Sequence, residues 1–391
     1  MSERPPLPYG RQSISEADIE AVVAVLRSDW LTQGPAVPAF EEAVASHCRT
    51  AHAVAVNSAT SALHIACMAL GVGAGDWVWT SPNTFVASAN CARYCGADVD
   101  FVDIDPGTLN LCPLKLASKL AQARKAGRLP KVVIPVHFAG QSCDMAAMAE
   151  LAKEYGFRII EDASHAIGGR YQGEPVGCGR YSDITVLSFH PVKIITTAEG
   201  GMALTQNAEL ARAMRLARSH GITRDAEQFL QTPEGPWHYE QHALGFNYRM
   251  TDLQAALGLS QMQRLQSFVA VRQTLVTRYE SLLAELPVRL QLKHASSESA
   301  HHLFVVRLDL ERLKLSRAQV IAALKQRHIH VNVHYKPVHT QPYYQALGSK
   351  VGDFPEAERY AREAFSLPMY PTLSPADQDH VVASLKAVLQ S

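Results

Sequence analysis

The chain has 391 residues, of which 47% are hydrophobic, and its 37 Lys and Arg residues equal its 37 Asp and Glu residues in number. A chain of this length can bury a large core and is expected to form two domains or one large one. The balanced charge argues against the basic surface that nucleic acids and anionic membranes attract, so the composition favours a globular protein that acts on small molecules.

The N-terminal residues lack the apolar core of a signal peptide, and no segment is apolar over the length that crosses a bilayer. We therefore expect a cytoplasmic protein with no membrane or nucleic-acid partner. The seven cysteines are odd in number and lie mostly in apolar segments, which is not the pattern of a disulfide framework. They are expected to be reduced and buried.

The first predicted element is an amphipathic helix within residues 13–30. Ser15 and Asp18 have the spacing of an N-terminal capping box. Apolar residues recur at helical spacing on one face, namely Ile19, Val22, Val23 and Leu26.

From residue 52 the pattern changes to short β-rich segments that alternate with helices, the first helix ending near Gly71. The predicted strands lie within residues 52–56, 76–82, 96–105, 131–138, 157–163, 183–190 and 200–205. Several of these segments are continuously apolar, as expected of strands that helices cover on both faces of a mostly parallel sheet. The fold class is therefore α/β.

After residue 260 long helical segments come first, followed by the β-rich segment 302–310 and the alternating segment 328–335. We expect a large domain over residues 1–260, whose N-terminal segment packs on a smaller α+β domain over residues 261–391. Residues 222–242 are polar and contain Pro and Gly, so they are predicted to form a loop or lid.

Polar residues follow three of the predicted strands, where ligands collect in open α/β sheets. The first set is the turn 57–63, whose hydroxyls and helix N-terminus suit an anion such as phosphate. Ser58, Thr60 and Ser61 supply those hydroxyls. Taken alone, Ser and Thr at a helix start are more commonly N-caps.

The second set contains Asp162, a carboxylate at the end of an apolar strand, and His165 three residues later. Burying such a charge is costly without a cationic partner. Taken alone, a strand-end Asp is more often a helix cap and such a histidine is more often structural.

The third set surrounds Lys193, which follows segment 183–190 and precedes small residues and a Glu-Gly-Gly turn. Apolar surroundings lower the pKa of a lysine and free its amine to attack carbonyls. A surface lysine is the simpler alternative. Together, an anion turn, a carboxylate for a pyridine nitrogen and a lysine for an aldehyde indicate pyridoxal 5'-phosphate (PLP).

Six motifs strengthen this interpretation: SATSAL, TSPNTFVAS, VHFAGQSCDM, EDASHAIGG, SFHPVKIITTAEGG and LGFNYRMTDLQAALGLSQ. On these motifs the chain resembles the DegT/DnrJ/EryC1/StrS family of sugar-nucleotide aminotransferases, from about Ile14 to the C-terminus. The resemblance implies fold type I of the PLP-dependent transferases, the aspartate aminotransferase fold. It also implies a homodimer that builds each active site across its interface.

The resemblance assigns roles to individual residues. Lys193 would form the Schiff base with PLP, and Asp162 would pair with the pyridine nitrogen. Ser58, Thr60, Ser61 and Ser188 would hold the phosphate, with Asn247 reaching it from the neighbouring subunit. Phe85 would stack on the ring, and His165 would lie beside the ring hydroxyl.

Two departures within the family inform the prediction. Many relatives have Gly where this chain has Ala59, which affects only the backbone approach to the phosphate. Relatives that dehydrate sugars replace the lysine with histidine, so Lys193 favours transamination.

Within the family, SFHPVKIITTAEGG and VHYKPVHTQPYY most resemble the transaminases of pseudaminic acid biosynthesis. The implied reaction moves an amino group from L-glutamate to C4 of a UDP-2-acetamido-2,6-dideoxy-4-hexulose in a ping-pong cycle. By the same resemblance, candidates for contacting the nucleotide sugar are Tyr9, Leu31, Thr32, Gln33, Gly34, His334 and Tyr335.

Two alternatives stay open at this point. The substrate could instead be a dTDP-linked or GDP-linked 4-keto sugar or a cyclic polyol ketone, or the chain could be a non-catalytic regulator that binds PLP or a sugar nucleotide. His328, His330, Asn332 and His334 alternate in sequence, but no carboxylate or thiolate cluster lies beside them. We therefore expect no metal site.

Overall fold

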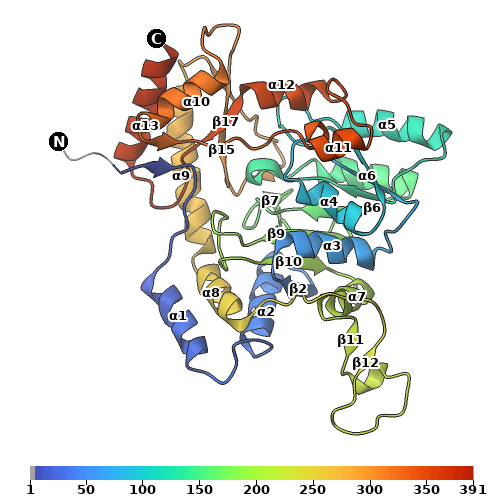
Figure 1. Cartoon of the computed structure of the whole chain (residues 1–391). Coiled ribbons are helices and arrows are strands. Elements are labelled where there is room, and N and C mark those ends of the chain that lie inside the picture. Colours follow the sequence, from blue (N-terminus) through green and yellow to red (C-terminus); the bar gives the residue numbers. More distant parts are fainter. Residues whose placement is uncertain (1–4, 391) are drawn as a thin grey trace.

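The structure is a computed structural model that describes residues 5–390 (Figure 1). Its centre is a seven-stranded sheet with the order β2-β10-β9-β6-β5-β3-β4. All neighbouring strands are parallel except β10, which is antiparallel to both β2 and β9. The strands are β2 (His52–Val56), β3 (Trp77–Thr80), β4 (Asp98–Phe101), β5 (Val132–Ile134), β6 (Arg158–Asp162), β9 (Ile184–Ser188) and β10 (Gly201–Thr205).

Helices cover both faces of this sheet, which explains its continuously apolar strands. Alternate residues of β2 point to the two faces. On one face, Val54 packs among residues of α3 (Ala59–Ala69), α4 (Ala87–Tyr94) and α7 (Ala208–Arg218). On the other face, Ala55 packs among residues of α2 (Ala36–Cys48) and α8 (Asp252–Met262). On the same side as α2 and α8, α5 (Pro113–Lys125) and α6 (Met145–Tyr155) pack on β3, β5 and β6. The predicted α/β class with a mostly parallel sheet is confirmed.

The C-terminal part is built on a three-stranded antiparallel sheet, β13-β15-β17. Its elements are α9 (Leu265–Leu283), β13 (Val288–Leu290), β15 (Phe304–Leu308), α10 (Arg317–Lys325), α11 (Pro342–Ala346), α12 (Pro355–Glu363), β17 (Ala364–Leu367) and α13 (Pro375–Leu389). The N-terminal strand β1 (Leu7–Pro8) joins this part by pairing in parallel with β16 (Ile329–His330). The division at residue 260 stays a prediction.

The alternating segment 328–335 forms less strand than its pattern predicts. Only β16 is strand, because its one partner β1 is two residues long and includes Pro8. Beyond it, Asn332 makes a single bridge to Ser366, and the chain then reaches the buried His334. Among residues 5–390, no group of three or more His, Cys, Asp and Glu side chains could hold a metal ion.

The predicted N-terminal helix is α1 (Glu16–Leu26), and Ser15 and Asp18 form its capping box. Buried Asp18 also accepts hydrogen bonds from Ser260 and Gln261 of α8, at 2.6 and 2.8 Å, which fixes α1 against that helix. The predicted apolar face, however, remains solvent-exposed at Ile19 and Leu26.

The segment predicted as a loop or lid forms an arm. Strands β11 (Ile222–Thr223) and β12 (Glu240–Gln241) pair in antiparallel fashion, and the chain between them extends away from the body (Figure 1). Shorter elements are β7 (Arg170–Tyr171), β8 (Glu174–Pro175), β14 (Ser297–Glu298) and the 3-10 turns η1 (Phe138–Gly140), η2 (Ala226–Gln228) and η3 (Val338–Thr340). No helix within residues 5–390 has the length and apolar character to cross a membrane.

Candidate active site

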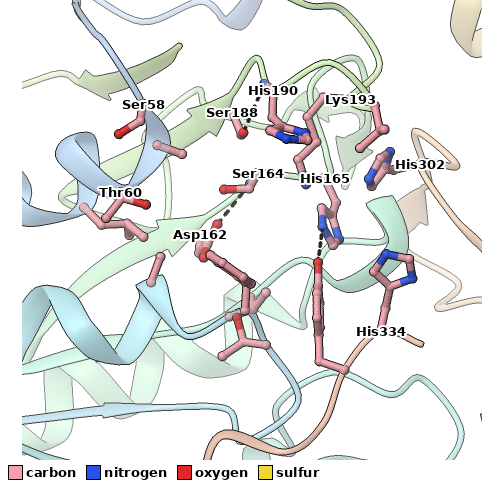
Figure 2. A pocket seen from close by; sticks show the side chains of 18 of the residues that line it. Ser58, Thr60, Asp162, Ser164, His165, Ser188, His190, Lys193, His302 and His334 are labelled. Atoms are coloured by element: carbon pink, nitrogen blue, oxygen red, sulfur yellow. Dashed lines mark hydrogen bonds between the residues drawn. The ribbon is translucent and has the colours of Figure 1, made fainter. Parts of the chain in front are cut away.

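A cavity of about 980 Å³ lies where β2, β6 and β9 end. Figure 2 shows Ser58 and Thr60 on one side of it, Asp162 near its middle, and Lys193, His302 and His334 on the other side. Its walls include eleven of the residues predicted from the sequence: Tyr9, Ser58, Thr60, Ser61, Phe85, Asp162, His165, Ser188, Lys193, His334 and Tyr335.

The turn after β2 builds an anion-binding end of the cavity. Ser58 is the N-cap of α3, and its hydroxyl accepts a hydrogen bond from the Ser61 amide at 3.1 Å. The Ser61 hydroxyl in turn donates to Asn57 at 2.7 Å, which fixes its direction. The helix start therefore presents backbone N–H groups, hydroxyls and the positive end of its dipole to the cavity.

Strand register places Ser188 beside this turn. Gly201 of β10 pairs with Val56 of β2 on one side and with Ser188 of β9 on the other. A Cβ atom at Gly201 would lie 2.4 Å from the Ala59 nitrogen and 2.5 Å from the Ser58 carbonyl carbon. The turn can pack this closely on β10 only because residue 201 is glycine.

Asp162 ends β6 as a buried carboxylate. Its Oδ2 accepts a hydrogen bond from the Ser88 hydroxyl at 2.6 Å, and its Oδ1 accepts one from the Ser164 amide at 3.1 Å. Both donors are neutral groups, so a cationic ligand in the cavity would compensate this charge. Ser88 is itself buried, and because its own proton goes to Asp162, its oxygen accepts a hydrogen bond from the Thr84 hydroxyl at 2.7 Å.

Lys193 projects from the turn that follows β9. The Lys193 amide donates to the His190 carbonyl at 2.9 Å, and the Thr196 hydroxyl and Thr197 amide both donate to the Phe189 carbonyl at 3.0 Å. Burial lowers the pKa of the Lys193 ammonium to about 8, against the opposing effect of the Asp162 carboxylate. About a tenth of this amine is therefore neutral at pH 7, far more than for an ordinary lysine.

His165 is held in one tautomer by its neighbours. Its Nδ1 accepts a hydrogen bond from the Ala139 amide at 3.3 Å, so the neutral ring carries its proton on Nε2 and donates it to the Tyr335 hydroxyl at 3.0 Å. Burial lowers the pKa of His165 most, and the charges of Lys193 and His334 lower it further, so this ring stays neutral. The Tyr335 hydroxyl proton is then free to donate to a ligand.

Several predicted residues lie outside the cavity wall. Asn247 is exposed and bridges to Ser219, and Thr32 bridges to Thr251. Leu31, Gln33 and Gly34 flank Thr32 and also do not line the cavity within the described chain. Their roles stay predictions.

The structure also brings in residues that sequence reasoning missed. Ser88 lies in the motif TSPNTFVAS, yet only its spatial contact with Asp162 marks it out. His302 lines the cavity, but in the sequence it is simply one histidine before an apolar strand. Glu199, Gln254 and Asn332 line the cavity too.

The residues present fit PLP. The hydroxyl-lined helix start suits its phosphate, and Lys193 suits its aldehyde. The buried Asp162 carboxylate, whose hydrogen-bond donors among the described residues are all neutral, suits its pyridine nitrogen. One cavity contains all three.

Comparison with known proteins agrees with this geometry. A model of the DegT/DnrJ/EryC1/StrS aminotransferase family matches residues 12–386. The spore coat polysaccharide biosynthesis protein SpsC of Bacillus subtilis is 39% identical over 387 residues, which cover 98% of this chain and 97% of SpsC.

Solved structures are similar over nearly the whole chain. The putative sugar aminotransferase Spr1654 of Streptococcus pneumoniae in its PMP form has a TM-score of 0.89 at 31% identity, covering 98% of this chain and 99% of that one. PseC of Helicobacter pylori, an aminotransferase involved in the biosynthesis of pseudoaminic acid, has a TM-score of 0.89 at 29% identity with the same coverage.

Proposed function

The chain belongs to the DegT/DnrJ/EryC1/StrS aminotransferase family, and from this premise we propose that it aminates C4 of a UDP-2-acetamido-2,6-dideoxy-4-hexulose with L-glutamate as donor. The coarser expectation, a PLP-dependent sugar aminotransferase of fold type I, is confirmed by the family match and the structural relatives. The observation that carries the proposal is the meeting of Lys193, Asp162 and the 57–61 turn in one cavity. The choice of substrate rests on the likeness to PseC.

Each residue has a distinct task in this proposal. Bound PLP supplies an electron sink and carries the amino group from one substrate to the next. The Asp162 carboxylate holds a proton on the pyridine nitrogen, and the Ser88 hydroxyl orients that carboxylate. The turn with Ser58, Thr60 and Ser61, together with Ser188, binds the phosphate and fixes the ring position.

Lys193 holds the cofactor covalently and then acts as the general base and acid. With the cofactor bound, the free Lys193 Nζ would take the proton from the donor α-carbon and, in the second half of the cycle, would deliver a proton to the sugar C4. The lowered pKa of Lys193 suits both directions of transfer. Phe85 at the cavity wall would cover the cofactor ring, and His165 with Tyr335 would border its hydroxyl.

The nucleotide sugar has its own candidate contacts. Tyr9 and His334 line the cavity with their rings 5.0 Å apart, and Tyr335 follows directly. Leu31, Thr32, Gln33 and Gly34 lie outside this wall. We assign them to the nucleotide end of a substrate that extends beyond the cavity, or to the cavity of a second subunit.

A homodimer completes the site in this proposal. Large apolar side chains stay exposed on the N-terminal segment, at Ile19, Leu26, Trp30 and Leu31. Several large exposed apolar side chains in one segment favour an interaction surface there. Asn247 lies outside its own cavity, so it is available to reach the phosphate site of a second copy.

Two measurements test the function. UDP-linked, dTDP-linked and GDP-linked 4-keto-6-deoxy sugars would be assayed side by side with L-glutamate, and we expect turnover of the UDP-linked 2-acetamido sugar. Exclusive turnover of another sugar, or of a cyclic polyol ketone, would replace our substrate assignment.

Lys193→Ala should abolish both the visible absorbance of covalently held cofactor and turnover, and a fully active Lys193→Ala enzyme would refute the assigned role.

A further inference from the structure

The cavity contains one buried polar side chain that has no hydrogen-bond partner. His302 is only 3% exposed, lines the cavity, and its Nδ1 lacks any partner within the described residues. Buried polar groups are almost always satisfied, so a buried ring at a ligand cavity that has no hydrogen-bond partner of its own indicates that the ligand supplies one, at the ring nitrogen that faces the cavity. Figure 2 shows the ring on the Lys193 side of the cavity, next to His165.

The backbone fixes the position of His302 without using its ring. The His302 amide donates to the Ala139 carbonyl at 2.9 Å, and the His302 carbonyl accepts from the buried Arg272 guanidinium at 3.1 Å. The ring itself packs against His165 with a centroid distance of 4.5 Å. The imidazole is therefore held in place, and its Nε2, the ring nitrogen that is not enclosed, remains available to a ligand.

Burial, together with its charged neighbours, keeps the His302 ring neutral. Burial lowers the pKa of His302 well below its usual range, and the cations of Lys193 and Arg272 and the neighbouring His165 and His334 rings act in the same direction. A neutral imidazole offers one N–H donor and one nitrogen acceptor.

The proposed reaction places two very different molecules in this one cavity. In a ping-pong cycle, an anionic amino acid and then an uncharged sugar ring must occupy the same space beside Lys193. No arginine is found among the described residues that line the cavity, and Lys193 is their only lysine. An arginine there would suit the carboxylate but would be left as a buried unpaired charge when the sugar binds.

We propose that His302 is a shared recognition residue for both substrates. Its Nε2 donates to a carboxylate oxygen of the amino donor in the first half-reaction and, in the other ring tautomer, accepts from a sugar hydroxyl in the second. This inference rests on the proposed function, and it deepens it by naming a residue that lets one site accept both ligand classes.

The test measures the two half-reactions separately on purified holoenzyme. L-glutamate alone is mixed with the PLP form and the change of cofactor absorbance is followed, and the sugar alone is then mixed with the PMP form. Glutarate, a dicarboxylate that cannot react, gives a binding constant through its effect on the cofactor spectrum. This last readout is independent of turnover.

His302→Phe removes both ring nitrogens and keeps a planar ring. We expect it to weaken glutamate and glutarate about 10- to 100-fold, as for loss of a hydrogen bond to a charged group, and to weaken the sugar about 2- to 10-fold. His302→Gln, which retains a donor and an acceptor, should recover much of both losses. The matched control is His301→Asn, because His301 bonds Gln273 at 2.7 Å and lines a different cavity of about 360 Å³.

The outcomes separate this inference from the proposed function. Wild-type protein that reacts with neither glutamate nor the sugar refutes the proposed function. His302→Phe and His302→Gln enzymes that match a reacting wild type in all three measurements refute the role of His302. Two folded variants that both lose the cofactor spectrum would assign His302 to cofactor binding instead, which also overturns the proposal.

Discussion

The ionisation of Lys193 leads to a prediction about cofactor capture. Its pKa is lowered to about 8, so below pH 8 most molecules carry an ammonium that cannot attack the PLP aldehyde, and above pH 8 most carry the amine. The rate at which PLP joins the cofactor-free protein should therefore rise with pH and level off above about 8. Stopped-flow absorbance between pH 6 and 10 measures it, and a rise centred near the ordinary lysine pKa, above 10, would contradict the buried environment.

Ser88 provides a second test at the residue scale. Its hydroxyl donates to Asp162 at 2.6 Å, and a hydrogen bond to a charged group contributes about 1.5–3 kcal/mol. Ser88→Ala should therefore weaken PLP binding about tenfold or more and lower the pH at which the bound cofactor loses its ring proton, because the carboxylate is no longer held in place. Ser88→Thr keeps the hydroxyl and should stay close to wild type. Equal PLP affinity and equal spectral titration in all three proteins would show that Ser88 does not orient Asp162.

How far the sequence predicted the site depends on how local each residue is. Asp162 and Lys193 each follow a recognisable strand, so their chemistry could be inferred from sequence neighbours. Ser88 contacts Asp162, which lies 74 positions further along the chain. His302 contacts His165, which lies 137 positions before it. Such pairings require the fold, because sequence spacing does not contain them.

At the scale of elements, the packing of β10 on the start of α3 predicts the effect of one methyl group. Gly201→Ala would place its Cβ within 2.6 Å of three backbone atoms of Ser58 and Ala59, so the phosphate turn must move. Overpacking of this kind costs about 1–3 kcal/mol. We expect a lower midpoint of thermal unfolding and a larger loss of PLP affinity.

The control for this change is Gly73→Ala, at a glycine with nothing within 4 Å of the added Cβ and no positive φ. It should shift stability by no more than about 0.5 kcal/mol. If the two variants had equal melting temperatures and equal PLP affinities, the close approach of β10 to the turn would have no functional consequence.

The helices and strands were predicted most accurately where several neighbouring elements pack against them. Strands β9 and β10 are buried along their whole length, and their mostly apolar sequences predict this burial. The segment 328–335 has an alternating pattern, yet it forms only a two-residue strand. Its strand β16 pairs with the two-residue β1, and Asn332 adds only an isolated bridge to Ser366. The arm 222–242 has a polar composition typical of loops, but Glu240 accepts amide hydrogen bonds from Leu230 and Gln231, both at 2.7 Å, and orders it.

At the scale of the whole molecule, the apolar face of α1 is not covered by the described part of the same chain. The sequence predicts an amphipathic helix, but Ile19 and Leu26 are 47% and 57% exposed although α1 is fixed to α8 through Asp18. The periodicity of apolar residues predicts that one helix face will be buried, but it does not indicate whether the same chain or a second subunit covers that face. We therefore expect light scattering to find a dimer, and Ile19→Glu with Leu26→Glu to shift the mass toward the monomer.

A shared active site can be tested by mixing two defective chains. Lys193→Ala lacks the catalytic amine, and Asn247→Asp places a carboxylate where we propose that the neighbour's phosphate binds, so each protein alone should have little activity. In a mixed dimer, Lys193 of the Asn247→Asp chain meets Asn247 of the Lys193→Ala chain, which rebuilds one intact site. Random exchange of equal amounts makes about half of the dimers mixed, each with one intact site of two, so activity should return to about a quarter of the wild-type value.

The mixing result discriminates between arrangements of Asn247. If Asn247 served the cavity of its own chain, a mixed dimer would contain one site without Lys193 and one with the altered residue 247, and activity would not return. The exposed position of Asn247, outside its own cavity wall, favours recovery. Dilution below the dimer dissociation constant should abolish the recovered activity, because an intact site exists only while two chains remain together.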